Sequence, residues 1–281
     1  MQYSHTTAGL ITAFSLLSSP LALADYIYDG NYVTYCGQYD ALNTTSGLYD
    51  IINNAWGDDG SGLTCTTTYL GESTDRFVVF NSTWRWYDTP TEVHSYPDAL
   101  LNTELFPLAL SDLSSLQLAA DWAIVPSPSV ETSTSEATSA GLDVIADVAI
   151  DLFLDEDASK TSDASAAAYE IMIWQAAYGN CDPIGYDPTS KSAPTQELDG
   201  VTYTLYQGPN ANEQTVLTWY PDSNLTSISV DYFPLLERLR IDGLLPAAAY
   251  LGRYQWGSEA KHSAQNQNIT FMVNSLTMSV S

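Results

Sequence analysis

The chain has 281 residues, of which 34 are acidic and 8 are Lys or Arg, so its formal net charge is −26. Because phosphate binding requires clustered Lys and Arg, this composition argues against nucleic acid as a partner, and the same sign disfavours anionic membranes and acidic polymers. A neutral polymer is not disfavoured. After residue 24 the chain has no apolar stretch long enough to predict a membrane-spanning helix.

The first 24 residues have the pattern of a secretory leader. Residues 10–17 form an apolar run too short to span a bilayer, and Ala22-Leu23-Ala24 is a small-x-small cleavage pattern. We therefore predict a signal peptide over residues 1–24, a single domain over residues 25–281, and a secreted, extracellular protein. Four Asn-X-Ser/Thr sequons agree with export and are expected to be glycosylated, at Asn43, Asn81, Asn224 and Asn268.

The cysteines and histidines limit the possible chemistry. Three cysteines in an exported chain predict one disulfide and one free thiol among Cys36, Cys65 and Cys181. The three histidines are scattered without ligand spacing, and the chain has neither a G-x-S-x-G elbow nor a phosphate-binding loop. We therefore expect no metal and no cofactor.

Strand composition dominates the first half of the chain, in the segments 49–57, 64–69, 76–87, 93–96 and 143–154. Trp84 and Trp86 are two residues apart, so they share one face of a strand. An indole pair of this kind suits either a sugar-binding platform or a sandwich core, and the sequence leaves both interpretations open. Residues 127–140 are rich in Ser, Thr and Pro and are predicted to form a surface loop.

Only residues 231–240 have a convincing helical pattern. Ser229 or Asp231 can cap the start, Pro234 is tolerated in the first turn, and Gly243 ends the segment. The chain shows no internal repeat and no second domain. We therefore predict an all-β sandwich with a single packed helix.

The segment 169–174 places a carboxylate among large apolar side chains. Alternation along a strand puts Glu170, Met172 and Trp174 on one face, with Ile171 and Ile173 on the opposite, core-facing side. An unpaired carboxylate in the core would cost several kcal/mol, roughly, so the first face is better suited to the wall of a cleft. The alternative is a Glu at a strand edge that points into water.

A second acidic segment, residues 254–259, puts Gln255, Gly257 and Glu259 on one predicted face. Two strand-borne Glu residues, each close to a Trp, fit a glycosidase, because hydrolysis of a glycosidic bond needs one carboxylic acid and one carboxylate. The alternative is that Glu259 is an ordinary exposed acid near Lys261.

Six segments, in this order, resemble motifs of glycoside hydrolase family 12. Residues 169–174 match the nucleophile strand Y-E-x-M-I-W, and residues 255–260 resemble the acid/base motif Q-F-G-T-E-A. The remaining likenesses are residues 53–57 to N-N-x-W-G, 93–97 to V-K-S-Y, 146–153 to A-D-V-x-Y-D-L-F and 182–185 to P-I-G. The likeness runs from about Cys36 to the end of the chain.

This resemblance implies a β-jelly-roll sandwich of two antiparallel sheets with a concave substrate cleft. It makes Glu170 the nucleophile, Glu259 the acid/base, and Asp151 a residue that hydrogen-bonds Glu170 and carries a proton, so that the pKa of Asp151 is raised. Hydrogen bonding around Glu170 is expected to favour its charged form. The resemblance also implies a Cys36–Cys65 disulfide with Cys181 free. The residues expected to bind substrate are Asn54, Trp56, Trp84, Trp86, Met172, Trp174 and Pro183.

The expected function is that of a secreted, monomeric, retaining endo-β-1,4-glucanase acting on neutral plant cell-wall glucans. A xyloglucan-specific endo-β-1,4-glucanase is a close alternative, since residues 206–210 are reminiscent of some xyloglucan-active members. A non-catalytic glycan-binding protein on the same fold is an alternative from another class, although it would not need Glu170, Asp151 and Glu259 together. Lys261 departs from the family pattern, in which an aromatic residue is common at this place.

Overall fold

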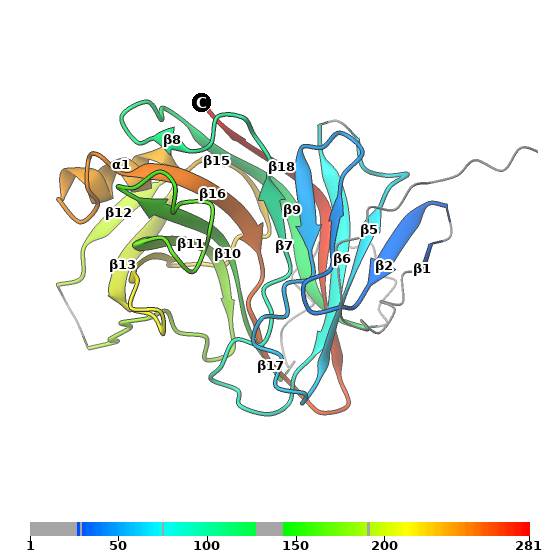
Figure 1. Ribbon diagram of the computed structural model, residues 1–281. Coiled ribbons are helices and arrows are strands. Elements are labelled where there is room, and N and C mark those ends of the chain that lie inside the picture. Colours follow the sequence, from blue (N-terminus) through cyan, green and yellow to red (C-terminus); the bar gives the residue numbers. More distant parts are fainter. Residues whose placement is uncertain (1–26, 29, 75, 128–142, 190–191) are drawn as a thin grey trace, which may run out of the picture.

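The computed structural model describes residues 27–28, 30–74, 76–127, 143–189 and 192–281, and these fold into two β-sheets with one helix (Figure 1). The predicted leader and almost all of the predicted loop over residues 127–140 lie outside the described residues. No helix in the described ranges is long and apolar enough to cross a membrane.

The smaller sheet is antiparallel throughout and contains most of the N-terminal strands together with the C-terminal one. In spatial order its strands are β1 (Ile27–Tyr28), β2 (Tyr32–Tyr35), β5 (Leu63–Tyr69), β6 (Val78–Arg85), β18 (Asn268–Val280), β9 (Leu116–Ser127) and β15 (Ser227–Asp231). The strands predicted over residues 64–69 and 76–87 are β5 and β6.

The larger sheet carries both acidic segments. Its spatial order is β12 (Thr195–Leu198), β13 (Val201–Pro209), β14 (Thr215–Pro221), β11 (Tyr169–Tyr178), β10 (Val144–Asp155), β16 (Tyr250–Gly257), β7 (Asp98–Leu101), β4 (Tyr49–Ile52) and β3 (Ala41–Asn43). Two short strands, β17 (Ala260–Ser263) and β8 (Leu108–Ala109), pair with β10 and β16. The β11–β14 pair is parallel, which departs from the expected antiparallel pattern.

Alternation along β10 and β11 separates the core from the outer face of the larger sheet, as predicted. Ile150, Leu152 and Ile171 point into the main core between the sheets and are fully buried. On the other face Met172 and Trp174 belong to a separate small apolar cluster. The larger sheet therefore has an outer face on which polar side chains can gather.

The helix α1 (Phe233–Ile241) begins two residues later than predicted. Tyr232 occupies the N-cap position and its side chain makes no capping hydrogen bond. The Asp231 carboxylate accepts the backbone N–H groups of Phe233 and Leu116 at 3.0 and 2.8 Å. Gly243 follows the helix with a φ of 72°, which agrees with its predicted role as a stop. Leucines on one side of the helix pack on the main core.

One predicted strand is absent. Residues 93–96 form no strand and make a single bridge, between Ser95 and Ala260. The segment is nevertheless fixed, because the Tyr96 hydroxyl donates to the Ala149 carbonyl at 2.9 Å. The strand-like composition of residues 93–96 therefore reflects burial of this segment next to β17 and not membership of a sheet.

The disulfide prediction is confirmed. Cys36 and Cys65 are bonded, and Cys181 is a free, buried thiol. The bond ties the segment after β2 to the middle of β5.

The four sequons lie in different environments. Asn43 is exposed, Asn81 and Asn268 are partly buried, and the exposed Asn224 uses its amide to bond both backbone groups of Ala177. Glycosylation remains a prediction at each of these positions.

Candidate active site

Glu170 lies at the start of β11, on the outer face of the larger sheet. It is paired with Phe153 on one side and Val216 on the other. The Asn210 amide donates from Nδ2 to Glu170 Oε2 at 2.7 Å. This face therefore holds a partly buried carboxyl group with a defined hydrogen-bond donor.

Asn210 is a candidate site residue that sequence reasoning missed. It follows β13, and its Oδ1 accepts the backbone N–H groups of Asn212 and Gln214 at 2.9 and 3.1 Å. These bonds fix the amide, so its Nδ2 is directed at Glu170. In the sequence, residues 206–210 are notable only for their likeness to xyloglucan-active enzymes, which does not predict a contact with Glu170. The parallel pairing of β11 with β14, which brings this loop to Glu170, has no local signal in the sequence.

Asp151 lies on β10, where it pairs with Met172 on β11 and with Gln255 on β16. It is buried, and its Oδ1 has no hydrogen-bond partner. The described residues do not show the expected hydrogen bond between Asp151 and Glu170. Burial and the negative charges of Glu170 and Glu259 raise the pKa of Asp151, as predicted. A neutral Asp151 can act as a donor, and its unpaired oxygen leaves that capacity unused.

Glu259 is not on a strand, so the predicted sharing of a strand face with Gln255 and Gly257 is wrong. Strand β16 ends at Gly257 and β17 begins at Ala260, which leaves Ser258 and Glu259 in a break opposite β10. Asp147 on β10 holds this break in place through its carbonyl and its side chain. The Ser258 hydroxyl donates to the Asp147 carbonyl at 2.6 Å, and the Glu259 N–H donates to Asp147 Oδ1 at 3.3 Å.

The electrostatics of Glu170 differ from expectation. Burial and the charge of Glu259 raise the pKa of Glu170 to about 7, although the hydrogen bond from Asn210 favours the charged form. The expected hydrogen bonding in favour of the charged form is present, but in the free protein this one amide donor does not offset desolvation and a second carboxylate. Since the charge of Glu259 acts on Glu170, the two carboxyl groups lie near one another.

Among the residues expected to bind sugar, Trp56 is the most accessible, with half of its surface exposed. Asn54 has a φ of 47° and donates from Nδ2 to Asp98 Oδ2 at 2.9 Å. Both residues lie in the turn after β4, at the edge of the larger sheet. Their placement is compatible with the predicted binding role.

The Asn54 amide belongs to a buried polar chain on the same face. Arg253 donates from Nε to Gln255 Oε1 at 3.2 Å, and Gln255 donates from Nε2 to Asp98 Oδ1 at 2.8 Å. Burial raises the pKa of Asp98 to about 7, against the hydrogen bonds from Gln255 and Asn54. The buried Asp98 carboxyl group on β7 therefore bonds β16 through Gln255 and the turn that carries Trp56 through Asn54.

Met172 and Trp174 are on the expected face but are closed off. Only 1% of Trp174 is exposed, because Tyr220 packs against its ring at 5.6 Å and the Lys261 ammonium lies 6.0 Å from its centroid. Met172 is buried in the same cluster. Neither side chain offers a free surface for sugar stacking in this state.

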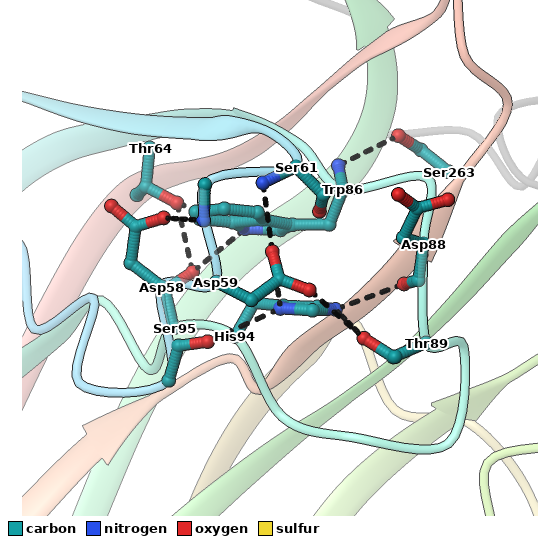
Figure 2. A network of polar contacts seen from close by, with 12 residues as sticks. Asp58, Asp59, Ser61, Thr64, Trp86, Asp88, Thr89, His94, Ser95 and Ser263 are labelled. Carbon is teal, nitrogen blue, oxygen red and sulfur yellow. Dashed lines mark hydrogen bonds and ion pairs between the residues drawn. The ribbon is translucent and has the colours of Figure 1, made fainter.

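Trp84 and Trp86 are core residues, so their assignment to the substrate site is corrected in favour of the other interpretation of the pair. Both are fully buried in the main core, Trp84 on β6 and Trp86 just after its end. Figure 2 shows Trp86 stacked on His94, with a centroid distance of 4.9 Å, and its Nε1 donates to the hydroxyls of Thr64 and Ser95 at 3.1 and 3.2 Å.

Pro183 is also buried, which argues against direct contact with a sugar. The exposed large hydrophobic residues of its loop are Ile184 and Tyr186, with 40% and 37% of their surfaces exposed. Tyr186 packs against Tyr206 and Tyr220 at 5.2 and 6.2 Å. The loop therefore exposes aromatic surface at Tyr186 and not at Pro183, the residue that the family motif indicated.

Comparisons with known proteins identify the family. The sequence profile described as glycosyl hydrolase family 12 matches residues 47–281. Xyloglucan-specific endo-beta-1,4-glucanase A of Emericella nidulans is 32% identical over 247 residues, covering 88% of this chain and 91% of the relative. The Aspergillus niger protein with the same description is 30% identical over 243 residues, covering 86% and 90%.

Solved structures of family 12 enzymes share this fold. Endoglucanase 3 of Trichoderma harzianum superposes with a TM-score of 0.73 at 26% identity, covering 91% of this chain and all of that one. The catalytic domain of Humicola grisea Cel12A, solved with a thio cellotetraose, superposes with a TM-score of 0.72 at 26% identity, covering 88% and 99%. The chain therefore belongs to glycosyl hydrolase family 12 and is a glycoside hydrolase.

Proposed function

We propose that the protein is a secreted, monomeric, retaining endo-β-1,4-glucanase in which Glu170 is the nucleophile and Glu259 the acid/base. The observation that carries this proposal is the Glu170 carboxyl group on the outer face of the larger sheet, where the Asn210 amide bonds it and the charge of Glu259 acts on it. A retaining glycosidase needs two carboxyl groups on opposite sides of the anomeric carbon, close enough for one to attack directly. The buried Asp151 nearby has a side-chain oxygen without a hydrogen-bond partner, which supports a role in the site.

In the first step Glu259 donates a proton to the glycosidic oxygen while Glu170 attacks the anomeric carbon, which forms a glycosyl ester and releases the leaving chain. In the second step Glu259 takes a proton from water, which attacks the same carbon and frees Glu170. Positive charge develops on the sugar ring in both transition states and favours the ionised form of Glu170. In this proposal a neutral Asp151, which has no hydrogen-bond partner on Oδ1 in the free protein, donates to this carboxylate during the reaction.

The coupling between Glu170 and Glu259 also supports the change of role at Glu259. Before attack Glu170 carries a negative charge beside Glu259, and once Glu170 is esterified that charge is gone. The same Glu259 side chain therefore meets a different neighbour in the two steps, in which it acts first as the acid and then as the base.

The proposed substrate is a neutral β-1,4-glucan. The net charge of −26 disfavours acidic polymers, and the half-exposed Trp56 provides an aromatic surface for a sugar ring. Xyloglucan is the second candidate, because the relatives from Aspergillus niger and Emericella nidulans carry xyloglucan-specific names. Reducing-sugar release from xyloglucan, mixed-linkage β-glucan and carboxymethylcellulose separates these candidates.

The mechanism is tested with Glu170→Ala. This variant should be folded and inactive, and azide should restore turnover of an activated aryl cellobioside as a glycosyl azide of inverted configuration. The wild-type protein should release a first product of retained configuration by NMR. A first product of inverted configuration would contradict the mechanism. Glucan binding by wild-type protein without any release of reducing ends would instead support the non-catalytic alternative.

A further inference from the structure

Lys261 occupies an unusual place for a cation. It lies on β17, two residues after Glu259, and its Nζ is 3.7 Å from Glu259 Oε2. The two side chains are only 12% and 16% exposed, so water screens this ion pair much less than a surface pair. The charged end of Lys261 is therefore held inside the cleft, beside the proposed acid/base.

Asp147 and Cys181 are buried polar neighbours of Glu259 and Lys261. The Cys181 thiol donates to Asp147 Oδ2 at 3.8 Å, and Asp147 Oδ1 accepts the N–H of Glu259. Burial lowers the pKa of Lys261, but Glu259, Cys181 and Asp147 more than offset this and raise it overall. The amine is therefore an ammonium throughout the working pH range.

We propose that Lys261 is a positioning residue that holds the Glu259 carboxyl group in the cleft and sets the upper pH limit of glucan hydrolysis. The inference rests on the proposed role of Glu259. It explains why a lysine occupies this position: the cation compensates for acidic side chains that meet here from several elements.

The sign of the effect follows from the groups around Glu259. An ammonium at this distance favours the charged form of a carboxyl group, whereas neighbouring acids favour the protonated form. The titratable groups that interact with Glu259 are Asp147 and Asp151 on β10, Glu170 on β11, and Tyr96, Cys181 and Lys261. Lys261 is the cation among them. Because the first step requires a protonated Glu259, the lysine limits that step at high pH and assists the second step, in which Glu259 is the base.

The test is Lys261→Met, with kcat/KM for a cello-oligosaccharide measured from pH 4 to 9. The alkaline limb should move up by about one pH unit, an estimate that allows for partial screening and the competing acids. Lys160→Met is the matched control, because it removes an equal charge from an exposed position. Lys261→Arg keeps the charge and should restore the wild-type limb.

A second substrate separates this effect from a structural one. Dinitrophenyl cellobioside has a leaving group that needs no proton, so wild type and Lys261→Met should share one alkaline limb with it. Lys261→Gln provides a second variant if the Met variant is unstable. An unmoved limb with the oligosaccharide, or an equal shift with both substrates, overturns the inference. Failure of the proposed function would appear differently, as a Glu259→Gln variant that hydrolyses unactivated glucan like wild type.

Discussion

Replacing Asn210 with Ala should reduce activity more at low pH than at high pH. The Asn210 amide donates to Glu170 at 2.7 Å and favours its charged form, against the burial and the Glu259 charge that raise the pKa of Glu170 to about 7. A hydrogen bond to a charged group contributes about 1.5–3 kcal/mol. Because Glu170 must be ionised to attack, losing this bond should move the acid limb of kcat/KM up by about 1–2 pH units, and lower kcat/KM below the limb about 10- to 150-fold.

The assay is kcat/KM for dinitrophenyl cellobioside from pH 4 to 9, since this substrate isolates the nucleophile from the acid. Asn212→Ala is the control, because its side chain bonds Gln214 in the same loop at 3.4 Å. Asn210→Asp retains the Oδ1 acceptor that fixes the loop and should shift the limb further, since it adds a negative charge. An equal loss of kcat/KM at every pH, together with a lower Tm, would show that Asn210 only supports the loop.

Two further predictions concern residues around the site. The pKa of Asp98 is about 7 in the folded protein against 3.8 in the unfolded chain, so the unfolded state loses its proton first as pH rises. The free energy of unfolding should therefore fall by up to about 4 kcal/mol between pH 4 and 7. Denaturant titrations of Asp98→Asn should show a weaker pH dependence than the wild type, and an unchanged pH dependence would refute the assignment. Trp84→Ala should cost about 3–5 kcal/mol of stability, because Trp84 is fully buried. Trp56→Ala should leave stability almost unchanged and weaken glucan binding about 3- to 10-fold by calorimetry, and the reverse pattern would show that Trp56 is structural.

The sequence by itself determined the fold class, because alternation is a local property. The two-residue period placed Ile171 and Ile173 in the core and Glu170 on the outer face, and the structure agrees. The linear order of the motifs also determined the family and the Cys36–Cys65 disulfide. These features depend on residue types and spacing along one segment, or on a resemblance carried by several segments in order.

Tertiary structure decided which candidate residues meet the cleft. Trp84 and Trp56 have equally aromatic side chains, but only the packing of the opposite sheet buries one and leaves the other exposed. Asn210 reaches Glu170 because β14 pairs in parallel with β11, a long-range contact without a local signal. Glu259 lies between the end of β16 and the start of β17, opposite Asp147 on β10, and the Lys261 ammonium on β17 lies beside its carboxyl group. Burial and charge are sums over neighbours from distant segments, so the sequence could indicate the carboxyl groups but not their electrostatic balance.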